Sequence, residues 1–143
     1  MKKIVLGLIG FFAFAIAGNA QCNKNLQLSS SKTSYLNGKM EVQNTKDESV
    51  VVDITKNTIT LTPNGNSQEA MSGKIKEINC GWKVPYKDGK IVIKSDLIDP
   101  SGDSKDATIT IEAKNGKITL LAEVMERPDQ KIRLEVDKME EKG

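Results

Sequence analysis

The stretch that decides the fold class runs from Thr108 to Val124 and reads Thr-Ile-Thr-Ile-Glu-Ala-Lys-Asn-Gly-Lys-Ile-Thr-Leu-Leu-Ala-Glu-Val. Asn115 and Gly116 favour a two-residue type I′ turn, because both central residues of that turn need a positive φ. Residues that favour β-structure alternate on both sides of this dipeptide. The stretch therefore predicts a β-hairpin.

The alternation of this hairpin also predicts its register. If Asn115 and Gly116 form the loop, the facing pairs are Lys114 with Lys117, Ala113 with Ile118, Ile111 with Leu120, Ile109 with Ala122 and Ala107 with Val124. All the apolar pairs then share one face, and the other face is polar except for Leu121. Because a one-residue slip would exchange the faces, the turn and the pattern support the same register. We expect the apolar face to be the floor of the scaffold.

Two further hairpins are predicted N-terminal of this one. Asn37-Gly38 is expected to close the first, which would set Tyr35 against Met40. The second would set Ile54 against Ile59 across a short polar connection. The serine-rich strand that precedes Asn37 is expected to lie at an edge of the sheet, and residues 44–47 are expected to form a polar turn.

Later strands show irregularities in their alternation. Between residues 74 and 84, Ile75 is out of phase with the apolar residues that follow it, and a β-bulge near Glu77 would restore the phase. Asp88-Gly89 is expected to form the next turn. Residues 138–143 are charged and are expected to fray.

The whole pattern predicts an all-β domain. Eight or nine short strands occur at regular spacing, without a long amphipathic helix, which indicates an antiparallel sheet. A closed or nearly closed meander barrel fits best, because closure removes exposed strand edges. A β-sandwich is the alternative. Residues 21–143 show no linker and no internal repeat, so they are expected to form one domain.

The first twenty residues predict a secretory signal peptide. Lys2 and Lys3 precede an apolar run over residues 4–17, and Gly18-Asn19-Ala20 supplies small residues for cleavage. The apolar run is too short to favour a stable membrane span. The mature domain is therefore expected in the periplasm or outside the cell.

The two cysteines, Cys22 and Cys80, are expected to form a disulfide bond in an oxidising compartment. The alternative is a reduced Cys80 with a Cys22 that is frayed, lipidated or paired with another chain. Lipid anchoring at Cys22 is disfavoured, because the residue before a lipidated cysteine should be small and here it is Gln21.

Composition excludes several classes of function. Two of the 21 basic residues lie in the signal peptide, so the remainder balances 19 basic against 19 acidic residues and has no net field to recruit nucleic acid. The chain has no histidine, the usual general base and the commonest zinc ligand, and it has no glycine-rich phosphate loop. Glu77 is read as a solvated bulge residue rather than a catalytic acid.

The loop from Asp99 to Asp106 is read as a surface turn rather than a calcium site, because it lacks EF-hand spacing. No enzyme activity, metal or cofactor is expected.

The aromatic residues supply the candidate binding site. Tyr35, Trp82 and Tyr86 are the only aromatic residues after the signal peptide. Trp82 and Tyr86 could form an aromatic platform at a barrel mouth that grips a ligand, and Tyr35 and Met40 are candidates of the same kind. The alternative is that Trp82 fills the core beside Cys80 while Tyr86 caps the strand end.

The signal, the run of strands and the motif Cys-x-Trp-Lys-x-Pro-Tyr-Lys-x-Gly-Lys over residues 80–90 together resemble small exported lipocalin-like proteins of Gram-negative bacteria. The resemblance implies an up-and-down barrel with an apolar interior and no catalysis. We therefore predict a monomeric, non-catalytic protein that binds a small apolar or amphipathic ligand. The alternative is an interaction or inhibitor module that recognises an envelope protein through loops such as residues 84–90 or 99–106. An apolar cavity in the barrel would favour the first hypothesis, and a solid interior the second.

Overall fold

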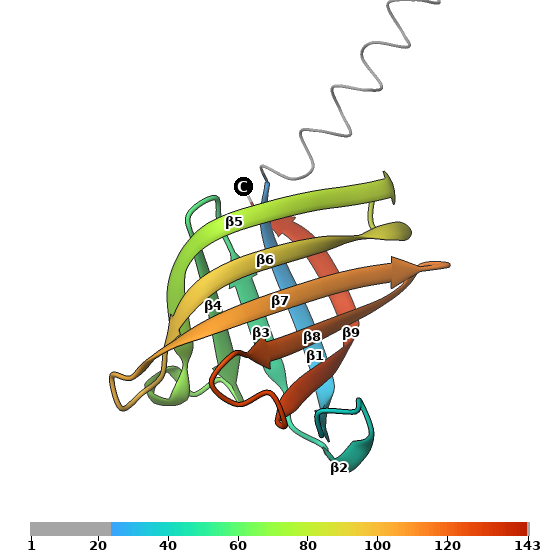
Figure 1. Ribbon diagram of the computed structural model, residues 1–143. Helices are drawn as coiled ribbons and strands as arrows, with labels where there is room; N and C mark the ends of the chain where they lie inside the picture. The colour runs from blue at the N-terminus through green and yellow to red at the C-terminus, as the bar shows by residue number, and fades with distance from the viewer. Residues whose placement is uncertain (1–23, 143) are drawn as a thin grey trace, which may run out of the picture.

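The computed structural model describes residues 24–142, so the predicted signal peptide and Cys22 lie outside the described residues. In this range the chain forms nine β-strands and one short 3₁₀-helix (Figure 1). Their bounds are β1 Asn25–Leu36, β2 Val42–Lys46, β3 Val50–Ile54, β4 Thr58–Pro63, η2 Ser67–Glu69, β5 Met71–Val84, β6 Asp88–Ile98, β7 Ser104–Lys114, β8 Lys117–Val124 and β9 Lys131–Lys142.

Eight of these strands close into an antiparallel barrel. Strands β3 to β9 pair in chain order, β1 pairs with β3, and β9 pairs back with β1. β2 is an additional strand, paired with the C-terminal part of β1. The prediction of an all-β meander barrel is confirmed, and its shape is lipocalin-like. A β-sandwich is excluded, since one continuous ladder runs around the whole barrel.

Barrel closure corrects two predictions about the chain ends. β1 was expected to lie at an edge, but it pairs with β3 on one side and along its length with β9 on the other. The expected fraying of residues 138–143 is also wrong for the described part, because Lys138 to Lys142 pair with Ser29 to Asn25 of β1. Lys138, Glu140 and Lys142 form ion pairs on the outer face, whereas Glu141 shares the side of Leu26 and accepts a hydrogen bond from the Tyr86 hydroxyl. The ladder with β1 satisfies the backbone.

The hairpin of β7 and β8 has the register that its sequence predicted. All five expected pairs are present, from Lys114 with Lys117 to Ala107 with Val124. Asn115 and Gly116 take φ values of 55° and 82°, as a type I′ turn requires. The inward residues Ile109, Ile111 and Leu120 are fully buried and form the centre of the core.

Two other local predictions are confirmed. Ile54 faces Ile59 across the β3–β4 turn. The register of β5 against β6 shifts between Ile75 and Glu77, where the sequence predicted a bulge. Ile91 and Ile93 of β6 point inward and are buried.

The first hairpin differs from its prediction. Tyr35 faces Asn44 instead of Met40, and residues 42–46 form β2 where a polar turn was expected to begin. The connection is longer because the Oδ1 atom of Asn37 accepts hydrogen bonds from the backbone N–H groups of Lys39, at 2.9 Å, and of Glu41, at 3.0 Å. Met40 completes this loop with φ at 65°. Side-chain capping by Asn37 thus replaces the two-residue turn.

The turn between β5 and β6 lies earlier than predicted. It spans residues 85–87, Tyr86 takes the positive φ of 63°, and Asp88 already belongs to β6. Gly89 lies outside this turn, in the strand pair of β5 and β6. A Cβ atom at residue 89 would lie 2.3 Å from the carbonyl oxygen of Gly81, so glycine permits the close approach of the two strands.

Candidate ligand-binding site

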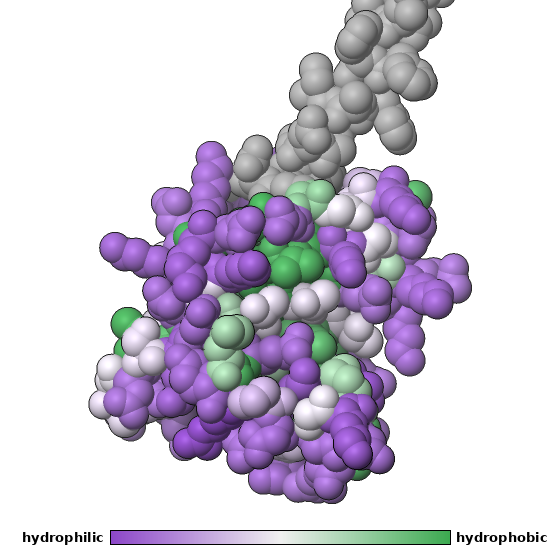
Figure 2. Space-filling model, viewed as in Figure 1, coloured by the Kyte–Doolittle hydropathy of each residue, from purple (hydrophilic) through white to green (hydrophobic). Residues whose placement is uncertain are grey.

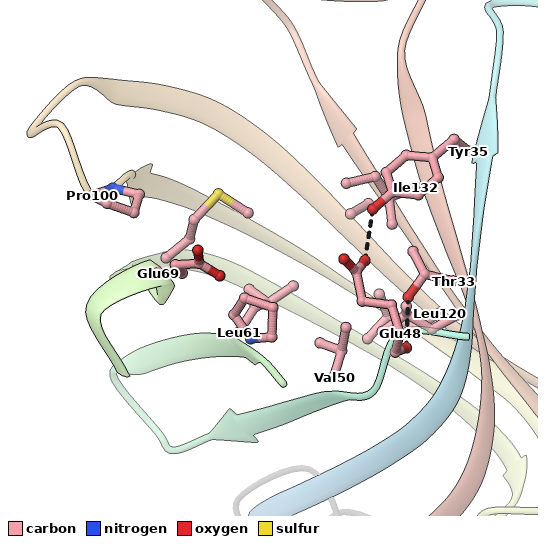
Figure 3. Close-up of a pocket in the computed structure, with 13 residues that line it drawn as sticks. Thr33, Tyr35, Glu48, Val50, Leu61, Glu69, Pro100, Leu120 and Ile132 are labelled. Carbon is pink, nitrogen blue, oxygen red and sulfur yellow. Dashed lines mark hydrogen bonds between the residues drawn. The ribbon is translucent and has the colours of Figure 1, made fainter. Parts of the chain in front are cut away.

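One end of the barrel opens into an apolar cavity of about 250 Å³ (Figure 3). The cavity lies at the end that carries β2, η2 and the β6–β7 loop. Its apolar wall comes from strands on opposite sides of the barrel and consists of Val50, Leu61, Met71, Leu120, Ile132 and Leu134. Because these strands are far apart in the chain, the cavity is a product of barrel closure.

Small side chains explain why the barrel is hollow at this end. Thr33 of β1 and Ala122 of β8 face the interior at this level, where larger residues would fill the space. Deeper in the barrel, Leu120 and Leu134 are buried and close the cavity floor. Beyond them the core is packed with isoleucine, so the cavity ends at a solid layer.

The polar rim of the cavity centres on Glu48, in the loop between β2 and β3. Its Oε1 atom accepts a hydrogen bond from the Tyr35 hydroxyl at 2.6 Å. Its backbone carbonyl accepts a second one from the Thr33 hydroxyl at 3.1 Å. Glu69 of η2 lies on the opposite wall (Figure 3). Two carboxylates therefore border an apolar space.

The surroundings of Tyr35 alter its ionisation. Burial, the hydrogen bond to Glu48 and the negative charge of Glu48 raise the pKa of Tyr35 to about 12. The Nζ atom of Lys46 lies 5.3 Å from the centroid of the Tyr35 ring, a cation–π distance. Within residues 24–142 neither Glu48 nor Glu69 forms an ion pair with a lysine or arginine. The rim of the cavity is thus acidic.

The opposite end of the barrel holds the other two aromatic residues. Trp82 and Tyr86 meet edge to face, with ring centroids 5.6 Å apart and an interplanar angle of 74°. The Tyr86 hydroxyl donates a hydrogen bond to Glu141 at 2.7 Å. Burial, followed by this hydrogen bond, raises the pKa of Tyr86 well above its usual range. The two rings pack against the core cluster.

The indole of Trp82 lacks a polar partner. Its Nε1 atom is buried and forms no hydrogen bond with any described residue. A buried N–H without an acceptor is uncommon. Within the described residues, Trp82 therefore contributes to this end through its apolar surface, which packs against the core cluster.

The four predicted binding residues fall in three places. Tyr35 lies at the cavity, whereas Trp82 and Tyr86 lie together at the other end. Glu141, the partner of Tyr86, pairs with Leu26, which is nine residues from Tyr35 along β1, or about 30 Å. Met40 is 43% exposed and lies beside the outer face of β7 to β9 rather than at the cavity.

Several cavity residues were not among the predicted ones. Glu48, Glu69 and Pro100 come from loops and a single helical turn, where no hydrophobic period exists to indicate a binding residue. Leu61 follows the strand alternation, which indicates an inward position but not a cavity. Met71 precedes the strand predicted over residues 74–84, although β5 begins at Met71. No signal in the sequence joins these segments.

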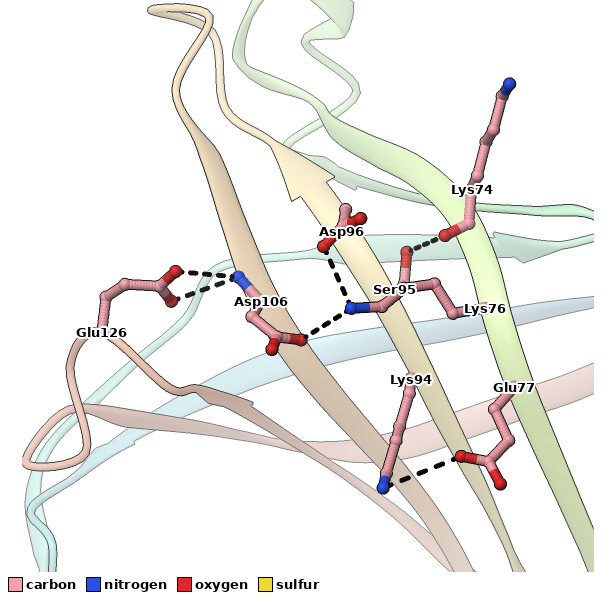
Figure 4. A network of polar contacts seen from close by, with 8 residues as sticks. All are labelled: Lys74, Lys76, Glu77, Lys94, Ser95, Asp96, Asp106 and Glu126. Carbon is pink, nitrogen blue, oxygen red and sulfur yellow. Dashed lines mark hydrogen bonds and ion pairs between the residues drawn. The ribbon is translucent and has the colours of Figure 1, made fainter.

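The remaining polar clusters are explained by the fold. Lys76 lies between Asp96 and Asp106, with 3.1 Å from its Nζ atom to each carboxylate, and Glu77 is 3.7 Å from Lys94 (Figure 4). These side chains are about half exposed, so their ion pairs contribute little stability. They tie neighbouring strands together on the outer surface.

The β6–β7 loop is closed by its own side chains. The Oδ1 atom of Asp99 accepts hydrogen bonds from the Ser101 hydroxyl and from the backbone N–H groups of Ser101 and Asp103. The Ser101 hydroxyl bond is the main cause that lowers the pKa of Asp99. Across residues 24–142 no group of three or more acidic or cysteine side chains is placed to hold a metal ion.

One face of the molecule is mainly polar. Figure 2 shows polar side chains over most of the face in view, with apolar residues gathered near its centre over β6 and its neighbours. Residues 24–142 contain no helix with the length and hydrophobicity of a membrane span.

The predicted disulfide bond between Cys22 and Cys80 stays a prediction. Cys80 lies in β5, and Cys22 is outside the described residues.

No protein-family model, curated protein or solved structure matches the chain. What defines the protein is therefore its architecture and its cavity. It is a small β-barrel of eight antiparallel strands in meander order, with one extra strand and an apolar cavity at one end. The likeness to lipocalin-like proteins holds for the shape of the barrel.

Proposed function

We propose that the protein is a non-catalytic binding protein that holds a small apolar or amphipathic ligand in the open end of its barrel. The observation that carries this proposal is the cavity of about 250 Å³ with its wall of aliphatic side chains. Transfer of an apolar ligand from water into such a space is favourable in proportion to the apolar area removed from water.

The volume limits the size of the ligand. An apolar protein cavity of about 150 Å³ accepts benzene, so by simple scaling this one suits a ligand of roughly ten non-hydrogen atoms. The open mouth permits a longer ligand to extend into solvent. A medium-length alkyl chain or a single substituted ring therefore fits better than a sterol.

The cavity favours this function over the alternative of a protein-recognition module. A module that works through its loops needs no hollow interior, and leaving the space empty sacrifices packing energy. A larger apolar residue at Ala122 would recover part of this packing energy. A binding function accounts for the small residue at this position.

The test compares two substitutions on one strand. Ala122→Leu adds apolar volume inside the cavity, whereas Thr119→Leu adds a side chain of the same kind on the outer face of β8. Octan-1-ol, used below its solubility limit, is the probe, and calorimetry measures its affinity. We expect the wild type and Thr119→Leu to bind it and Ala122→Leu to lose at least tenfold in affinity. Equal affinity in all three proteins would contradict the proposal.

A second experiment concerns the natural ligand. Protein purified from its own host is analysed by native mass spectrometry, and bound molecules are extracted with organic solvent. We expect a co-purifying compound that the Ala122→Leu protein does not retain. The same spectra, recorded with and without reductant, test the proposed export, with cleavage after Ala20 and a bond between Cys22 and Cys80.

A further inference from the structure

We propose that the ligand carries a cationic head group, such as an ammonium, on its apolar body, and that Glu48 and Glu69 face this head at the cavity mouth. This inference rests on the proposed function and specifies the chemistry of the ligand. It is argued from the charge, hydrogen bonding and position of the two carboxylates.

Glu48 is held in place at the mouth with bonding capacity to spare. Its Oε1 atom accepts the Tyr35 hydroxyl at 2.6 Å, and its backbone is tied to Thr33, so both ends of the residue are fixed. Its Oε2 atom accepts no hydrogen bond from a described residue. A fixed, half-buried carboxylate with one open oxygen is preorganised for a donor that comes from outside the chain.

Glu69 presents a second negative charge across the same opening. It ends the short helix η2, lies on the wall opposite Glu48, and borders the same apolar space (Figure 3). A ligand head with positive charge at this opening would be attracted by both carboxylates.

Some carboxylates outside the cavity have a lysine partner. Glu123 contacts Lys131 at 2.6 Å, and Glu77 and Glu140 each have a lysine partner within 4 Å. Glu48 and Glu69, like Glu112 on the outer face, have no lysine or arginine partner in residues 24–142, so no ion pair neutralises the two charges at the mouth. The Nζ atom of Lys46 lies over the ring of Tyr35, so this positive charge near the rim is directed to the aromatic face.

The experiment compares three probes that share an eight-carbon tail, which suits the volume of the cavity. They are octylammonium, octan-1-ol and octanoate, which carry a positive, a neutral and a negative head. Calorimetry at neutral pH and low salt, below the aggregation concentration of each probe, gives the three affinities. We expect octylammonium to bind about tenfold more tightly than octan-1-ol, with octanoate the weakest. The advantage of octylammonium should shrink as salt is added.

Substitutions then test whether Glu48 and Glu69 cause the preference for the cationic probe. Glu48→Gln and Glu69→Gln should each lower the affinity for octylammonium about threefold to tenfold and leave that for octan-1-ol unchanged. Glu112→Gln, on the exposed outer face of β7, is the matched control and should change neither. Circular dichroism confirms that each variant is folded. If Glu48→Gln weakens the loop, Glu69→Gln still tests the inference from a separate element.

The outcomes separate the two proposals. If octan-1-ol binds in the cavity but the three heads show equal affinity, or octanoate binds best, the inference about the head group is wrong and the proposed function stands. If no probe binds the wild type, both are wrong. A preference for octylammonium that survives both glutamine substitutions would also overturn the assignment of Glu48 and Glu69.

Discussion

The two ends of the barrel are built from the same pair of groups but differ in their packing. At each end a tyrosine hydroxyl donates a hydrogen bond to a glutamate, Tyr35 to Glu48 at 2.6 Å and Tyr86 to Glu141 at 2.7 Å. At one end the ring borders a cavity, and at the other it packs edge to face against Trp82. The same polar contact thus frames an open site at one end and a closed one at the other.

The difference shows that an aromatic residue near a barrel mouth does not by itself make a binding site. Trp82 supplies the apolar volume that closes its end, where it packs against the core cluster. At the other end the inward positions carry Thr33 and Ala122, which are too small to fill the barrel. The size of a few inward side chains therefore decides which end is hollow.

The largest effect on stability is expected from shortening Leu120, which forms part of the cavity floor. Leu120 is fully buried, so Leu120→Ala should lower the free energy of unfolding by about 2–5 kcal/mol, because it removes buried methyl groups and leaves a void. The cavity should also deepen and accept a longer alkyl probe. Urea unfolding measures the loss of stability. Thr119→Ala, one residue away on the outer face, is the control and should change the stability by less than about 1 kcal/mol.

Removing the tryptophan separates packing from binding. Trp82→Ala should lower the free energy of unfolding by about 1–3 kcal/mol, less than for a fully buried tryptophan, because the side chain is only partly buried. Its effect on the affinity for octan-1-ol should be within twofold, since Trp82 lies at the end away from the cavity. A loss of affinity comparable with that of Ala122→Leu would mean that the ligand binds at the aromatic end.

The two tyrosines allow a matched comparison. Tyr35→Phe and Tyr86→Phe each remove one hydrogen bond to a carboxylate, and each should cost about 1–2 kcal/mol in unfolding experiments. Only Tyr35→Phe should change the affinity for octylammonium, because it frees Glu48 to move from the cavity mouth. Equal effects of the two substitutions on binding would remove the distinction between the ends.

The smallest expected effect is a loss of folding stability at alkaline pH. The folded pKa of Tyr35, about 12, lies above its usual value of about 10, so the folded state favours the neutral phenol. The stability from this preference is fully present below pH 10 and is lost as the pH rises toward 12. Thermal unfolding from pH 9 to 12 should show a steeper decline for the wild type than for Tyr35→Phe. Parallel curves for the two proteins would contradict this prediction.

Much of the local structure could be predicted from the sequence. The register of the β7–β8 hairpin, the pairing of Ile54 with Ile59 and the bulge before Glu77 all depend on neighbours in the chain, and all three are confirmed. The prediction of a two-residue turn at Asn37-Gly38 was wrong, because the Asn37 side chain caps a longer loop. The preference of a dipeptide for one turn type competes with such side-chain hydrogen bonds, and alternation alone does not resolve the competition.

The candidate site was predicted only in part. Tyr35 lies at the cavity, but Met40 points to the outer surface, and Trp82 and Tyr86 belong to the other end. Glu48 could not be found from the pattern, since it lies in a polar connection. Its position at the mouth depends on where β1 ends and β3 begins in the closed barrel.

By itself the sequence determined the fold class and the inward face of most strands, because alternation and turn chemistry act over a few residues. Only the tertiary structure decided that β1 closes the barrel against β9 and that one end stays hollow. Closure joins residues about a hundred positions apart in the chain. The cavity is the space that remains between the inward side chains of these distant strands. Both depend on the sum of long-range contacts, which no local pattern contains.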